Sequence, residues 1–101
     1  MIVASWKWRQ VRGALEKKGF KVDRQTDHVY YRFYYHGKAT SIRTKVSHGD
    51  KGELHGNSAL AGQMRDQLGL PTRRLFNDLL DCPLSENEYA AKLVEQGLVH
   101  D

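Results

Sequence analysis

Imidazole, phenol and guanidinium groups alternate along one short segment of the sequence. The segment reads TDHVYYRFYYHG, from Thr26 to Gly37. In a β-strand, side chains two residues apart share a face and stand about 7 Å apart. A strand here would therefore present a row of rings and cations on one face: His28, Tyr30, Arg32, Tyr34 and His36. Val29, Tyr31, Phe33 and Tyr35 would then face the core.

The chemistry of this row suits unpaired RNA. Cations neutralise phosphates, and tyrosine rings stack on unpaired bases with about 1–3 kcal/mol per base. We predict an RNA-binding face that combines this strand with the returning one, and its residues are Tyr30, Arg32, Tyr34, Arg43 and Lys45. The alternative is that these side chains only stabilise the sheet, since cross-strand pairs contribute about 0.2–1 kcal/mol each.

His28 is the candidate for catalysis. Imidazole titrates near neutral pH and can accept the proton of a ribose 2′-hydroxyl, whose oxygen then attacks the adjacent phosphate without a metal. A nearby cation would stabilise the phosphorane charge, and a tyrosine or a second histidine would protonate the leaving oxygen. The alternative is a surface histidine without a catalytic role.

Three strands must position these groups. Alternation and turn residues predict strands over Phe20–Gln25, His28–His36 and Lys38–Val46, with a turn at Gly37. A helix is expected from Ser5, its N-cap, to about Lys18, and Gly13 inside it suggests close packing on the sheet. Residues 47–56 are expected to form a loop.

Helical periodicity returns after this loop. Further helices are expected to begin after an N-cap at Asn57 or Ser58, at Thr72 and at the capping box Ser85–Glu88. Apolar residues at helical or strand spacing predict the buried positions, among them Val22, Leu60, Met64, Leu68, Phe76, Leu79, Tyr89 and Leu93.

This order predicts an α+β fold. We expect residues 1–70 to form an α-β-β-β-α core, a three-stranded antiparallel sheet with helices on one face. Residues 71–101 are expected to form a helical extension of the same single domain. Their apolar side chains would join the core, form a protein-interaction surface, or cover the predicted RNA-binding face.

Charge and composition narrow the class of protein. The net charge is +4, but the chain through Ser58 holds 12 Lys and Arg against 5 Asp and Glu, and the rest holds 4 against 7. A basic first half favours a polyanionic partner. We expect neither a membrane span nor a secretory signal, and the lone Cys82 fits a cytoplasmic location.

We expect neither a metal nor a cofactor. His48 and His55 flank a loop with Asp50 and Glu53, but structural zinc sites need four close donors, usually including cysteine. The glycines of this loop lack the Gly-Lys-Ser/Thr ending of a nucleotide-binding loop.

Several segments resemble the HicA family of toxin ribonucleases. LEKKGF at 15–20 resembles the family's helix end, and TDHVYY at 26–31 has His28 where the family's functional histidine stands. The return strand's TKVSH and the helix end QLGL also resemble the family. The resemblance covers about residues 6–70, whereas Thr26-Asp27 replaces the family's Gly-Ser.

The resemblance has consequences for fold and function. It implies a double-stranded-RNA-binding-domain-like fold, and a metal-independent endoribonuclease that cleaves mRNA with His28 as general base. It also implies a HicB-like antitoxin as partner. Two alternatives stay open: an RNA-binding module that does not cleave, and a protein-interaction adaptor.

Overall fold

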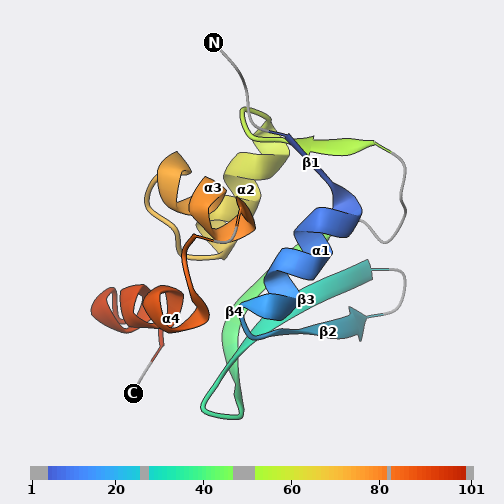
Figure 1. Cartoon of the computed structure of the whole chain (residues 1–101). Helices are drawn as coiled ribbons and strands as arrows, with labels where there is room; N and C mark the ends of the chain where they lie inside the picture. Colours follow the sequence, from blue (N-terminus) through green and yellow to red (C-terminus); the bar gives the residue numbers. More distant parts are fainter. Residues whose placement is uncertain (1–4, 26–27, 47–51, 82, 100–101) are drawn as a thin grey trace.

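A three-stranded antiparallel sheet with the strand order β2-β3-β4 lies at the centre of the fold (Figure 1). The computed structural model describes residues 5–25, 28–46, 52–81 and 83–99, and at positions 24, 25 and 28 the backbone only. The strands are β2 (Phe20–Gln25), β3 (His28–Tyr35) and β4 (Lys38–Val46). The α+β class and the three-stranded antiparallel sheet are thus confirmed.

The turn between β3 and β4 takes His36 out of the predicted strand. Tyr35 pairs with Lys38, so the hairpin loop has two residues, and His36 and Gly37 have φ values of 52° and 77°. Positive φ at both loop residues is the hairpin geometry that matches the twist of a sheet. The His36 ring packs against Tyr35, with centroids 4.1 Å apart, so His36 does not continue the row of alternate residues.

Two short strands replace structure that was predicted as helix and loop. β1 (Ser5–Lys7) pairs antiparallel with β5 (Glu53–His55). The predictions that Ser5 caps the first helix and that 53–55 belong to a loop are therefore wrong, while 47–51 lie outside the described residues. The pairing buries Trp6 and Leu54, and the Trp6 indole N–H donates to an Asp81 carboxylate oxygen at 2.7 Å.

Four helices complete the described fold: α1 (Trp8–Lys17), α2 (Ala59–Gln67), α3 (Arg73–Asp81) and α4 (Glu86–Glu95). Figure 1 shows α1 lying across the sheet, and the core-facing residues of β3 beneath the helices are Val29, Tyr31 and Phe33. The aromatic ring of Tyr89 on α4 packs against Phe33, with centroids 5.1 Å apart. The C-terminal helices therefore join the core on the same side of the sheet as α1.

Most predicted core positions are buried, Tyr35 is partly buried, and two are exposed. Val22 is 45% exposed and Leu60 is 44% exposed. Val22 lies on β2, an edge strand of the sheet. Its place on the core-facing side of the strand therefore does not ensure that a helix covers it. In α2 the buried residues are Ala61 and Met64, and Leu60, in the first turn, lies on the solvent side of the helix.

Local capping chemistry sets the helix ends. The Ser58 hydroxyl accepts a hydrogen bond from the N–H of Ala61, and Ser85 and Glu88 form the predicted reciprocal capping box. Hydrogen bonds to the Glu88 carboxylate from the backbone of Ser85 and from its side chain hold the pKa of that carboxyl below its usual value. Gly19 follows α1 with φ of 93°, a conformation that glycine adopts without strain. None of the described helices combines the length and apolar character needed to cross a bilayer.

Replacing Gly13 with alanine is expected to stabilise the protein. Gly13 lies inside α1, and a Cβ built there meets nothing within 4 Å, so the predicted close packing at this residue is wrong. Alanine is favoured over glycine inside a helix by about 1 kcal/mol. Urea unfolding of Gly13→Ala should show a gain of about this size.

Gly69→Ala is the matched control. At Gly69 φ is 72°, and a Cβ would lie 2.6 Å from Leu98 Cδ1 and 2.9 Å from Leu93 Cδ2. This substitution should lower stability. A loss of stability in Gly13→Ala would contradict the open surroundings of Gly13 in α1.

Stability should also fall at alkaline pH because of Tyr89. The hydroxyl of this residue donates to the carbonyl of Leu68 at 2.6 Å, and burial raises the pKa of Tyr89 well above its usual range. The unfolded chain loses the tyrosine proton above about pH 10 while the folded chain keeps it. The unfolding free energy should therefore drop above about pH 10, by up to about 1.4 kcal/mol per pH unit from this group.

Urea unfolding between about pH 9 and pH 11 measures this dependence. Tyr89→Phe should be less stable at neutral pH, because phenylalanine has no hydroxyl to donate to the Leu68 carbonyl. Its unfolding free energy should also decline less steeply at alkaline pH. An equally steep decline in wild type and variant would rule out Tyr89 as its source.

Candidate nucleic-acid interface

The sheet face opposite the helices combines aromatic rings with cations from three strands. Strand register places Lys21, Arg32 and Arg43 in one row, and Asp23, Tyr30 and Lys45 in the next. We call this surface the open face, and its residues are Lys21, Asp23, Tyr30, Arg32, Tyr34, Ser41, Arg43 and Lys45. All five side chains predicted to bind RNA therefore lie together on one surface.

Solvent reaches this surface. Lys21, Arg43 and Lys45 are exposed, and Tyr30 and Tyr34 are half-buried. The buried residues of β3 are Val29, Tyr31 and Phe33, which alternate with the open-face residues. None of the described helices seals the open face, so the tyrosines do not become core residues beneath the C-terminal helices.

Each tyrosine of the open face carries a cation above its ring. The guanidinium carbon of Arg43 lies 4.8 Å from the ring centroid of Tyr30. The ammonium nitrogen of Lys21 lies 4.6 Å from the ring centroid of Tyr34. Such contacts contribute about 0.5–1 kcal/mol at exposed sites. They place two positive charges against the faces of the rings, on a surface that an anion can reach.

Arg32 has a different environment from the other cations. Its Nε lies 3.2 Å from an Asp23 carboxylate oxygen, and its Nη1 donates to the Thr40 carbonyl at 2.7 Å. The side chain is only 22% exposed. Because Asp23 is on β2 and Thr40 is on β4, Arg32 ties the three strands together. It offers less surface to a phosphate than Arg43 or Lys45.

A β-bulge lies beside this tie. The β3–β4 register shifts between Arg32 and Tyr34, and the Thr40 hydroxyl donates to the Phe33 carbonyl at 2.7 Å. Beyond the shift, Tyr34 stands opposite Ala39. Bulges bend a strand and re-aim its side chains. This one leaves a small residue beside the Tyr34 ring.

The predicted catalytic residue begins β3. His28 pairs with Gln25 of β2 in the strand register. In β3 it lies two positions before Tyr30. Thr26 and Asp27 lie outside the described residues, and the description of His28 stops at its backbone. The role of His28 as a base therefore stays a prediction from the sequence.

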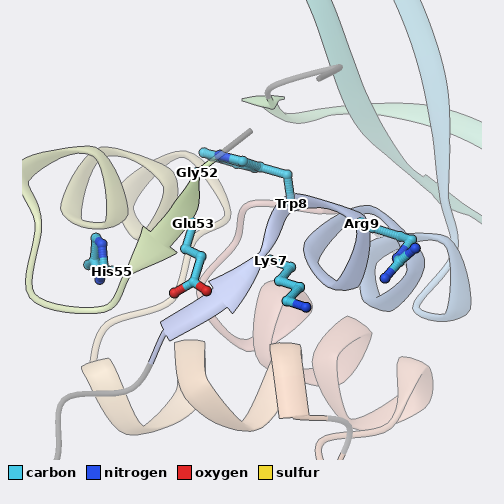
Figure 2. Close-up of a pocket in the computed structure, with 6 residues that line it drawn as sticks. All are labelled: Lys7, Trp8, Arg9, Gly52, Glu53 and His55. Atoms are coloured by element: carbon cyan, nitrogen blue, oxygen red, sulfur yellow. The ribbon is translucent and has the colours of Figure 1, made fainter. Parts of the chain in front are cut away.

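A second polar surface lies on the β1–β5 ribbon. An open groove there is lined by Lys7, Trp8, Arg9, Gly52, Glu53 and His55. Figure 2 shows Lys7 and Glu53 projecting from neighbouring strands to one side of the ribbon. The groove holds two cations, Lys7 and Arg9, and one carboxylate, Glu53, whereas the open face holds four cations and one carboxylate and so has the larger positive charge.

Sequence reasoning missed this groove because it missed the pairing of β1 with β5. It considered Glu53 and His55 only as metal ligands beside His48 and Asp50, which lie outside the described residues. Within the described part of the chain, no three His, Cys, Asp or Glu side chains are grouped so that they could hold a metal ion. The alternation of SWK and ELH around a central apolar residue was the available indication.

Comparisons of the chain with protein-family models, with curated proteins and with solved structures found no match. Function is therefore inferred from the open face and from the segments that resemble the HicA family.

Replacing Arg32 with lysine should weaken the sheet. A lysine ammonium cannot reproduce the planar fork that contacts Asp23 and Thr40 together. We expect Arg32→Lys to cost about 1 kcal/mol in urea unfolding, the usual contribution of one hydrogen bond. Arg43→Lys is the matched control, because exposed Arg43 packs over Tyr30, and it should change stability by less than about 0.5 kcal/mol. Equal effects of the two substitutions would show that Arg32 does not tie the strands.

Proposed function

We propose that the protein is an endoribonuclease of HicA type, which binds mRNA on the open face and cleaves it without a metal. One observation carries the binding part of the proposal. Two tyrosine rings on a sheet face that solvent reaches each hold a cation above them, Arg43 over Tyr30 and Lys21 over Tyr34. Cations that neutralise phosphates and rings that stack on bases are the two components of single-strand binding.

The order of elements supports the HicA resemblance. Helix α1, the strands β2, β3 and β4, and helix α2 occur in the order expected for a double-stranded-RNA-binding-domain-like fold, with β5 between β4 and α2. The segment LEKKGF spans the end of α1 and the start of β2, and HVYY opens β3. β1, β5, α3 and α4 would be additions to that fold. The HicA resemblance also makes a HicB-like antitoxin the proposed partner.

The proposed reaction is a transesterification within the RNA chain. His28 takes the proton of a ribose 2′-hydroxyl, and the 2′-oxygen forms a bond to the adjacent phosphorus. The bond from phosphorus to the 5′-oxygen of the next nucleotide breaks, and that oxygen takes a proton from water. The hydroxide left behind takes the proton held by His28, which restores the base. The products are a 2′,3′-cyclic phosphate and a 5′-hydroxyl. Exposed Arg43 and Lys45 would stabilise the negative charge on the phosphorane.

An RNA-binding module without cleavage is the second candidate. The groups of the open face support binding directly, whereas cleavage depends on His28 and on the resemblance. The two functions share one surface and differ in a single residue. A protein-interaction adaptor would need neither the cations nor the tyrosine rings.

Incubation of labelled single-stranded RNA with the full chain in EDTA tests the proposal. Wild-type protein should cut the RNA and leave 2′,3′-cyclic phosphate ends, whereas His28→Ala should bind the RNA with unchanged affinity and leave it intact. RNA with 2′-deoxy sugars is the substrate control, and it should be bound but resist cleavage. Binding should weaken with salt, and Arg43→Ala should lower the slope of log K against log salt by about 0.7 for each phosphate that is no longer neutralised.

The other outcomes are equally clear. Salt-dependent binding without cleavage by wild type would favour the non-catalytic module. Absence of RNA binding would overturn the proposal and favour an adaptor.

A further inference from the structure

Tyr30 and Tyr34 form two separated stacking positions along one strand. They are four residues apart in β3, which places them about 13–14 Å from each other. Arg32 lies between them, held down by Asp23 and the Thr40 carbonyl. The strand thus presents ring, cation and ring at intervals of about 7 Å.

The neighbours of Tyr34 leave room beside its ring. Its cross-strand partner on β4 is Ala39, and its N–H donates to the carbonyl of Gly19 at 3.1 Å. A methyl group and a glycine therefore flank the ring along the sheet, and Lys21 lies above it. Tyr30 stands between Asp23 and Lys45, with Arg43 above it.

The cations above the rings do not prevent a base from stacking there. Arg43 and Lys21 are exposed and have long side chains. Stacking of a base on an aromatic ring is worth more than an exposed cation–π contact, so a base displaces the cation. The displaced guanidinium of Arg43 can then stack on the outer side of the base or pair with a phosphate.

We infer that the open face binds three consecutive unpaired nucleotides, with the first and third bases stacked on Tyr30 and Tyr34 and the middle one over Arg32. This inference rests on the proposed RNA binding. An extended nucleotide chain advances per nucleotide by about the spacing of alternate strand residues, and the aromatic residues of RNA-binding sheets stack two or three bases. A duplex is rejected, because its bases already stack on one another.

Binding measurements with short RNAs on the His28→Ala full chain test the stacking. Tyr30→Ala and Tyr34→Ala should each weaken binding of single-stranded RNA by about 5- to 150-fold, the equivalent of one base stack. Tyr30→Phe and Tyr34→Phe retain the ring and should stay within about twofold of the parent. These phenylalanine variants, with circular dichroism of all variants, separate the loss of a stack from the loss of the fold.

A separate variant tests the contribution of charge to RNA binding. Lys45→Ala should lower the salt dependence of binding and leave the preference for single strands over duplex unchanged. If the alanine variants at Tyr30 and Tyr34 bind single strands as tightly as the parent while salt still weakens binding, RNA is held by charge alone. The stacking inference then fails, and the proposed function stands.

Trinucleotides with one abasic sugar test the register. Loss of the first or third base should weaken binding by the same factor as the corresponding tyrosine-to-alanine variant. Loss of the middle base should have little effect, because Arg32 offers no ring. Equal losses at all three positions would overturn the three-nucleotide register, and failure to bind any RNA would overturn the proposed function as well.

Discussion

The contact between Tyr89 and the aromatic residues of the sheet decides which side of the sheet stays available. The ring centroid of Tyr89 lies 5.7 Å from that of Phe20 and 5.1 Å from that of Phe33, and the Tyr89 hydroxyl donates to the Leu68 carbonyl. This contact anchors α4 on the side already occupied by α1. Burial of the same apolar area on the other side would have covered Tyr30 and Tyr34.

Strand β3 serves the core and the surface at once. Val29, Tyr31 and Phe33 are buried beneath the helices, and the residues between them form the middle of the open face. Because side chains alternate strictly, a one-residue slip in pairing would exchange the two sets. Burial of Phe33 therefore also fixes the direction of Arg32 and Tyr34. Core packing and the proposed RNA binding are set by one register.

The cations of the open face fall into two groups with different physical roles. Arg32 is tied to Asp23 and Thr40 and stiffens the sheet across three strands. Arg43 and Lys21 each lie against the face of a tyrosine ring, and both remain exposed. A rigid centre with adjustable cations at its flanks suits a ligand whose charges repeat along a flexible chain.

Neighbouring residues alone determined much of this protein. Alternation and turn residues defined the bounds of β2 and β4, and the Ser85–Glu88 capping box marked the start of α4. The same alternation grouped Tyr30, Arg32 and Tyr34 with Arg43. Such features depend on contacts within a strand, a turn or a hairpin, and the sequence encodes them locally. Only the tertiary structure paired β1 with β5, exposed Val22 and Leu60, and placed α4 against Phe33. Each of these depends on residues far apart in the chain, and a local pattern does not show which distant segments pack together.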